Sequence, residues 1–219
     1  MKKRRKRGIK REYKESNFKV TIFGSSRVKK RDPLYRQIEE FARKIGERDM
    51  DLITGGGPGL MEAASEGHRA GSKGNKKIHT IGLAIRLLKK QKPNKYLEVI
   101  KNHSRFSGRL DSFMLLSNVV VVAPGGVGTM LELFYTWQLV QAEQICNIPI
   151  ILLGSEWAQL LKWIKKYPLR RKYLNREDMK SLFLVKNCDE ALEIIDMAHT
   201  DYKRGGKNFC LNYKKYSLS

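Results

Sequence analysis

Short apolar runs alternate with amphipathic segments along most of this chain. The runs are rich in β-branched residues and end in turn-forming residues, as strands do, whereas the amphipathic segments repeat apolar positions at helical spacing. Strands are expected at 18–23, 50–53, 78–83, 97–101, 118–123, 148–153 and 182–185, and helices at 33–45, 60–70, 104–117, 128–144, 157–164 and 189–198. This alternation predicts an α/β fold, a Rossmann-like doubly wound, mainly parallel sheet of about seven strands with helices on both faces.

Two segments carry further information about packing. In the strand expected at 118–123, the residues after Asn118 form a continuous apolar and mostly β-branched run without alternation, which is typical of a central parallel strand that is covered on both faces. The helix expected at 128–144 is apolar nearly all round, so one side can pack on the sheet while another needs a second cover. We therefore expect a homodimer or a larger homo-oligomer.

The net charge of +22 is concentrated at the two ends of the chain. Residues 1–17 and 201–219 are expected to be basic, flexible tails around a single domain at 18–200, because blocks of like charge repel and bury little. The tails leave nucleic-acid binding open, but only with weak support, and solvated ends are the simpler interpretation. A protein associated with RNA through these tails is therefore a third hypothesis for the function.

The expected location is the cytoplasm. No apolar run is long enough to span a membrane, and the basic N-terminus is not followed by the apolar segment of a secretion signal. The three cysteines are odd in number and widely spaced, which predicts neither a disulfide framework nor a zinc site and suits a reducing compartment. The four histidines also lack metal-ligand spacing, so no metal is expected.

Three expected strands run directly into glycine-rich turns. These turns are Gly24-Ser25-Ser26, the segment 55–59, and the segment 125–129, and at the carboxyl edge of a parallel sheet they should lie side by side. Glycines let the main chain approach a ligand, and a helix starting at the third turn directs free N–H groups toward a phosphate. Any one turn alone could be a ligand-free connection. The chain contains neither the P-loop pattern nor the complete GxGxxG pattern of dinucleotide-binding enzymes.

Two charged residues are expected beside these turns. Glu132 lies one turn into the helix that the third loop opens, and Arg109 lies early in the preceding helix, whose beginning shares the same edge of the sheet. An arginine, a carboxylate and a phosphate cradle would make a plausible active site. Without the loop, Glu132 would be only a helix-stabilising acid and Arg109 a surface ion-pair partner.

The segment Pro124-Gly-Gly-Val-Gly-Thr-Met-Leu-Glu132 resembles the PGGxGTxxE motif of the LOG family, a group often labelled as lysine decarboxylases. Gly24-Ser25-Ser26 and the segment 54–64 resemble two further family segments, so the resemblance covers roughly residues 18–165. It places Arg109 at the family's catalytic arginine, although Leu110 replaces the lysine that follows it in many members. Arg105 is a second candidate for this arginine, but the spacing favours Arg109.

The resemblance implies hydrolysis of the N-glycosidic bond of a purine or cytokinin nucleoside 5′-monophosphate, to the free base and ribose 5-phosphate. Arg109 and Glu132 would be catalytic. The phosphate would be bound by Gly125, Gly126, Val127, Gly128 and Thr129, and the rest of the substrate by Ser25, Ser26, Gly56, Gly57, Met61 and Glu62. No cofactor is expected, because lysine decarboxylation needs a lysine Schiff base to pyridoxal phosphate and no lysine stands in or beside the three loops. The alternative is a nucleotide sensor of the same fold without turnover.

Overall fold

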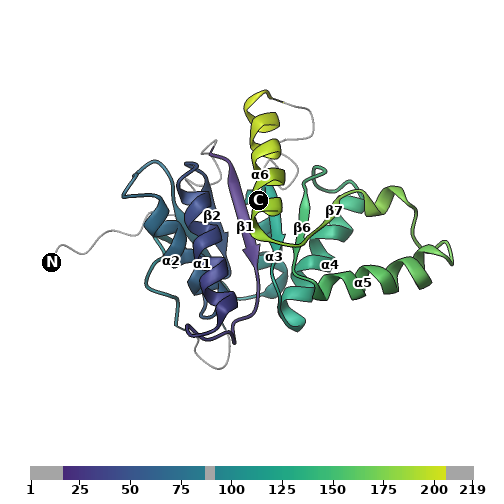
Figure 1. Ribbon diagram of the computed structural model, residues 1–219, viewed down its shortest axis with the longest axis horizontal. Coiled ribbons are helices and arrows are strands. Elements are labelled where there is room, and N and C mark those ends of the chain that lie inside the picture. The colour runs from purple at the N-terminus through teal and green to yellow at the C-terminus, as the bar shows by residue number, and fades with distance from the viewer. Residues whose placement is uncertain (1–16, 87–91, 206–219) are drawn as a thin grey trace.

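The computed structural model describes residues 17–86 and 92–205, and it contains a seven-stranded sheet in which every pairing is parallel (Figure 1). The strands are β1 (Lys19–Phe23), β2 (Asp51–Thr54), β3 (Thr80–Ile85), β4 (Val99–His103), β5 (Val119–Val122), β6 (Ile150–Leu153) and β7 (Leu182–Val185). Their order across the sheet is β4-β3-β2-β1-β5-β6-β7. The chain therefore changes direction between β1 and β5, the switch point at which such sheets bind ligands.

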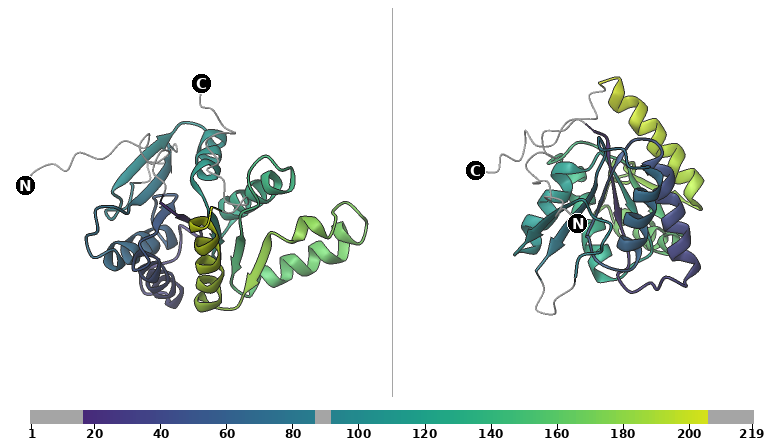
Figure 2. Two further views of the ribbon diagram at one scale, coloured as in Figure 1. Left: turned by 90° about the horizontal axis from the view of Figure 1, so that it is seen from above. Right: turned by 90° about the vertical axis from the view of Figure 1, so that its left-hand side faces the viewer.

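In the described part of the chain, six α-helices cover the two faces of the sheet, which confirms the doubly wound architecture (Figure 2). They are α1 (Pro33–Gly46), α2 (Leu60–Gly71), α3 (Phe106–Leu116), α4 (Val127–Gln141), α5 (Glu156–Ile164) and α6 (Cys188–Lys203). The apolar residues of α1, α2 and α6 pack in one core cluster, and those of α3, α4 and α5 pack in another. The sheet separates these two clusters.

The position of strand β5 between two cores explains why its sequence is apolar without alternation. Val119 and Val121 belong to the core on the α1, α2 and α6 side, whereas Val120 and Val122 belong to the core on the other side. All four side chains are fully buried. The prediction of a central strand covered on both faces is confirmed, because neither orientation of a β5 side chain reaches water.

Most helices begin within two residues of the positions predicted from the sequence, but some of them end several residues away from the predicted positions. Asp32 caps α1 by accepting a hydrogen bond from the Leu34 amide at 2.9 Å, and Pro33 occupies the first turn, as predicted. Helix α6 continues to Lys203, five residues beyond its predicted end at Ala198. A π-helical turn at Lys165–Leu169 and a 3₁₀ turn at Glu177–Met179 were not predicted. The π turn holds Pro168, which cannot donate the hydrogen bond that an α-helix needs.

Helices α1 and α2 cross at very short range because glycines line the contact. A Cβ atom on Gly67 would lie 1.8 Å from the Glu39 carbonyl oxygen, and one on Gly71 would lie 2.0 Å from the Arg43 carbonyl oxygen.

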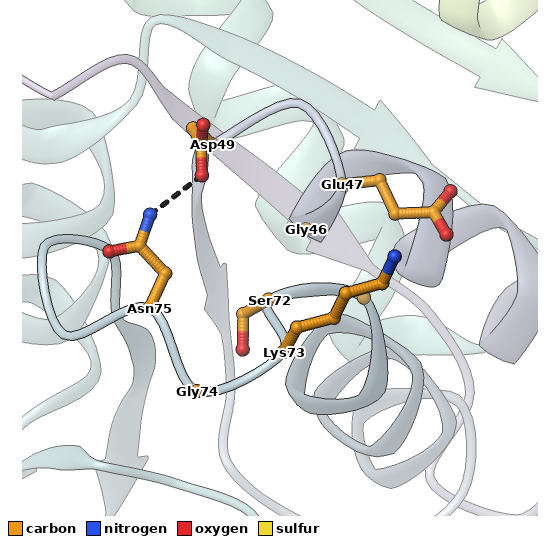
Figure 3. Close-up of a pocket in the computed structure, with 8 residues that line it drawn as sticks. Gly46, Glu47, Asp49, Ser72, Lys73, Gly74 and Asn75 are labelled. Atoms are coloured by element: carbon orange, nitrogen blue, oxygen red, sulfur yellow. Dashed lines mark hydrogen bonds between the residues drawn. The ribbon is translucent and has the colours of Figure 1, made fainter.

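A pocket of about 550 Å³ opens where both helices end, next to the hydrogen bond from Asn75 to Asp49 (Figure 3). Asp49 lies two residues before β2, so this pocket lies at the amino edge of the sheet, opposite the predicted site.

Three further predictions concern the covalent state and the surroundings of the chain. Cys146 takes part in a disulfide bond, so the prediction of no disulfide is wrong at this residue, whereas Cys188 is a free thiol. Spacing along the sequence could not show this, because disulfides depend on the distance between Cα atoms in the fold.

Within the described ranges, none of the helices combines the length and apolarity needed to cross a membrane. Most of the two predicted tails, residues 1–16 and 206–219, lies outside the described residues.

Candidate active site

The three glycine-rich loops meet at the carboxyl edge of the sheet. The Ser25 amide donates to the Pro124 carbonyl at 3.0 Å, and the Leu60 amide donates to the Ser25 carbonyl at 2.9 Å. The first loop is thus bonded both to the third loop and to the end of the second. The sequence-based expectation that the loops lie side by side is confirmed, because β2, β1 and β5 are adjacent strands.

Gly59, at the end of the second loop, is required for this close approach. Its φ is +71°, and a Cβ atom there would lie 2.4 Å from the Ser25 carbonyl oxygen. Any L-residue would therefore be strained in its own backbone and would also push the first loop away. The glycine lets the N-terminus of α2 lie directly against the first loop.

The third loop has open space beside its main chain. Cβ atoms on Gly126 and Gly128 would meet nothing within 4 Å among the described residues, and the Val127 side chain is 84% exposed. In contrast, Thr129 is buried and packs against Gly125. Helix α4 begins at Val127 without a side-chain cap, so its first N–H groups face this open space. Such a helix N-terminus favours an anion.

Arg109 and Glu132 form a buried ion pair next to these loops. Nη1 of Arg109 donates to Oε1 of Glu132 at 2.9 Å, and the two residues are 9% and 8% exposed. Arg109 is held from two further sides, since its Nε donates to the Leu83 carbonyl at 2.7 Å and its guanidinium lies 5.0 Å from the centroid of the Phe113 ring. The pair that the spacing predicted is therefore assembled, with the arginine locked between β3 and α3.

The second glycine-rich loop makes room for this arginine. A Cβ atom on Gly55 would lie 2.3 Å from Nη2 of Arg109 and 2.7 Å from the sulfur of Met61. Met61, predicted as a substrate-binding residue, thus lies at the same point as the catalytic candidate. A side chain on Gly55 would displace both residues.

Burial changes the acidity of Glu132. Desolvation raises its pKa from the ordinary 4.5 to about 7, although Arg109 acts in the opposite direction through its charge and its hydrogen bond. Oε2 of Glu132 has no hydrogen bond to any described residue. The site therefore holds a carboxyl group that changes protonation near neutral pH and has one oxygen free for a ligand.

The remaining predicted residues are spread around the second loop. The main chain of Gly56 and Gly57 is held by Asn94, whose amide donates to the Gly56 carbonyl at 2.9 Å and whose Nδ2 donates to the Gly57 carbonyl at 3.1 Å. Glu62 lies in the first turn of α2, and its Oε1 is 3.8 Å from Nζ of Lys30. Ser26 is exposed in the first loop. Within the described residues, no hydrogen bond or ion pair joins Glu62 to Arg109 or Glu132.

A cluster around Glu66 holds the segment 92–97 in place, and the sequence patterns did not reveal it. Oε2 of Glu66 accepts hydrogen bonds from Tyr35 at 2.9 Å and from Lys30 at 3.0 Å, and Oε1 accepts one from Tyr96. Although desolvation opposes the shift, these hydrogen bonds hold the pKa of Glu66 below its usual value. Through Tyr96 and Asn94, the segment 92–97 is held against α2 and the second loop.

The two candidate arginines, Arg105 and Arg109, lie in different surroundings. Arg105 is exposed at the cap position of α3, while Arg109 is the arginine that contacts Glu132. Leu110, which replaces the lysine of many LOG proteins, is buried. Its position therefore places an apolar side chain in the core instead of a cation near the loops.

No group of three or more His, Cys, Asp or Glu residues in the described ranges is arranged to hold a metal ion.

Comparison with known proteins adds information about ancestry. The profile of the family described as "possible lysine decarboxylase" matches residues 61–195, which is more than half of the chain. The match includes Met61, Arg109 and Glu132.

Among curated proteins, the chain is 27% identical over 142 residues to pyrimidine/purine nucleotide 5′-monophosphate nucleosidase of Escherichia coli (strain K12). The alignment covers 63% of this chain and 31% of that protein, so the chain spans about a third of the length of the relative. Among solved structures, the structural-genomics target TM1055 has a TM-score of 0.62 and 23% identity, over 82% of this chain and 99% of that one. The molybdenum cofactor carrier protein of Chlamydomonas reinhardtii has a TM-score of 0.61 and 17% identity, over 84% and 99%.

These two structures support the same α/β fold, and the family profile establishes kinship. The chain belongs to the "possible lysine decarboxylase" family, which is the LOG family that its PGGxGTxxE segment resembles.

Proposed function

We propose that this protein hydrolyses the N-glycosidic bond of a purine or cytokinin nucleoside 5′-monophosphate and releases the free base and ribose 5-phosphate. The observation that carries the proposal is the buried Arg109–Glu132 pair beside a glycine-rich loop at the switch point of the sheet. The curated relative named as a nucleotide 5′-monophosphate nucleosidase supports this chemical class. Among the described residues, the contacts of Arg109 and Glu132 involve no lysine, so the family name "possible lysine decarboxylase" does not describe the chemistry that we propose.

In the proposed reaction, Glu132 acts at the ribose. Breaking the bond from C1′ to the base nitrogen builds positive charge on the sugar, and the bond electrons leave with the base, which takes up a proton. The Glu132 carboxylate stabilises this charge, and its free Oε2 orients or deprotonates the water that adds to C1′. The reaction needs the ionised carboxylate, so a pKa of about 7 places its working range near neutral pH.

The other groups bind and orient the substrate. Arg109 keeps its charge and serves as a fixed hydrogen-bond donor to the departing base or to the phosphate. The loop Gly125, Gly126, Val127, Gly128 and Thr129 holds the 5′-phosphate, because its main chain is open and α4 directs N–H groups toward it. Ser25, Ser26, Gly56, Gly57, Met61 and Glu62 complete the substrate site in this proposal. The reaction uses neither a metal nor an organic cofactor.

The direct test is to incubate the purified chain with adenosine, guanosine, cytidine, uridine and isopentenyladenosine monophosphates and to follow released base by chromatography. Release from a purine or isopentenyladenine nucleotide is expected, and release from none of them contradicts the proposal. Arg109→Ala should weaken both binding and turnover. Arg105→Ala is the matched control. It also removes one positive charge, but Arg105 is exposed and lies four residues before Arg109, so turnover should be unchanged.

A nucleotide-binding protein without turnover is the second candidate. The fold shared with a molybdenum cofactor carrier favours this class, since that protein is named for carrying and not for hydrolysis. Calorimetric binding of a nucleoside monophosphate without release of base would support this alternative. The presence of both Arg109 and Glu132, with Nη1 of the arginine 2.9 Å from Oε1 of the glutamate, favours the enzyme over this alternative.

We also propose that the chain works as a homodimer or larger homo-oligomer in the cytoplasm. Helix α4 exposes Met130, Leu131 and Phe134 close to the proposed phosphate loop, and a second copy would cover this apolar surface. Analytical ultracentrifugation should show an oligomer that Phe134→Lys dissociates. A monomeric wild-type protein at micromolar concentration would contradict the proposal.

A further inference from the structure

The segment that follows α5 has an unusual composition. Residues 162–173, named here the basic arm, hold six Lys or Arg and three aromatic residues but no acid. All six cations are exposed, and within the described parts of the chain none of them forms an ion pair. Figures 1 and 2 show the arm at the opposite end of the molecule from α1 and α2. Its charge is therefore concentrated and not neutralised locally.

The aromatic side chains of the arm are presented to solvent. Trp163, Tyr167 and Tyr173 are 54%, 41% and 73% exposed, whereas Trp157 on the core side of α5 is buried. The rings of Trp163 and Tyr167 lie 6.0 Å apart, and Nζ of Lys166 lies 5.2 Å from the Tyr167 ring centroid. Helix α5 thus packs on the sheet without these rings, which form a surface of adjacent aromatic and cationic groups.

A groove runs beside the arm at the edge of the sheet. It measures about 780 Å³ and is lined by Lys162, Lys165 and Lys166 together with Leu161, Leu182 and Leu184. The two leucines at its floor, Leu182 and Leu184, belong to β7, the edge strand. Positive charge and apolar surface therefore meet in one concave region that is separate from the Arg109–Glu132 site.

We propose that the basic arm and its groove bind single-stranded nucleic acid. Six unpaired cations suit a phosphate backbone, whose binding gains free energy from released counterions. Exposed Trp and Tyr rings offer stacking surfaces to unpaired bases, which a duplex would keep inside its own stack. An anionic membrane would satisfy the charges as well, but a run of three exposed rings between the cations matches alternating bases and phosphates more closely.

The charge contribution is tested by fluorescence anisotropy with the full chain and a labelled single-stranded RNA of about 20 nucleotides. Lys165→Glu/Lys166→Glu should lower affinity at least tenfold and reduce the slope of log K against log salt by about 1.4. The control is Arg36→Glu/Lys73→Glu, which makes the same change in net charge at exposed positions on the α1 and α2 side. Equal losses in both double variants would overturn the proposal, because they would indicate only net charge or the basic tails.

The stacking contribution is tested at Trp163. Trp163→Ala should weaken binding about tenfold, and Trp163→Phe should retain most of the affinity because a ring remains. Unchanged binding by Trp163→Ala would contradict the proposed stacking surface. The same variants are then tested with duplex RNA and with phosphatidylserine vesicles. Loss of vesicle binding with no effect on single-stranded RNA would overturn the assignment in favour of a membrane surface. Nucleotide hydrolysis should be unchanged in all arm variants.

Discussion

The raised pKa of Glu132 predicts that part of the protein's stability disappears as the pH rises. In the folded protein this carboxyl group titrates at about 7, compared with 4.5 when it is solvated. Between these values the folded state binds more protons than the unfolded state, so the free energy of unfolding falls as the pH increases. The loss begins above pH 4.5 and is complete once the pH has passed through about 7.

The magnitude follows from the size of this difference. At about 1.36 kcal/mol per pH unit, titration of Glu132 removes about 3 kcal/mol of unfolding free energy. Glu132→Gln is the matched variant, because a glutamine keeps the shape, still accepts from Arg109 and does not titrate. Relative to this variant, the wild type should be more stable at pH 5 than at pH 8 by about 2.5 kcal/mol, because about a quarter of the total loss has already occurred at pH 5.

The assay is urea unfolding followed by tryptophan fluorescence at several pH values, with the difference between wild type and Glu132→Gln compared at each one. Subtraction removes the contributions of the other titrating groups. A difference that stays constant within about 0.5 kcal/mol from pH 5 to pH 8 would show that burial does not raise the pKa of Glu132. It would mean that Arg109 compensates fully for the burial of the carboxylate.

Three further predictions concern the loops and the support of Arg109. Gly59→Ala should cost more than about 2 kcal/mol in chemical denaturation, because its Cβ would clash with the first loop, whereas Gly74→Ala, with φ of +79° but open space, should cost about 1 kcal/mol. Asn94→Ala should raise KM several-fold with a smaller change in kcat, since it releases the second loop, while Asn75→Ala at the opposite edge should change neither. Phe113→Leu should lower kcat/KM and cost about 1–2 kcal/mol in stability, because the ring beneath the guanidinium is lost, and wild-type values in steady-state kinetics would contradict this role.

The parts of the fold that local sequence determines could be predicted well. The uninterrupted valines of β5 indicated a strand buried on both faces, and Asp32-Pro33 indicated the start of α1. The proximity of Arg109 and Glu132 could also be predicted, because helices in such a fold run antiparallel to the strands and begin at the same edge. The expected order of strands and helices was therefore enough to predict that these two side chains lie close together.

Other features depend on contacts between distant segments and could not be predicted. The Glu66 cluster joins the β1–α1 connection, α1, α2 and the segment 92–97, and no pattern in one segment indicates the others. The pKa of Glu132 depends on how completely the folded chain removes water from it. The disulfide of Cys146 likewise depends on three-dimensional proximity. The exposure of the rings in the basic arm depends on which face of α5 packs against the rest of the fold.

The central claim is that Glu132 performs hydrolysis beside a phosphate loop. The most direct measurement compares the rate of base release from the preferred nucleoside 5′-monophosphate by wild type and by Glu132→Gln, together with calorimetric binding of the same nucleotide. We expect release by the wild type, a loss of at least about 100-fold in the variant and nearly unchanged binding, because only the charge needed in the transition state is removed. Equal rates for the two proteins, or no release by the wild type, would contradict the claim.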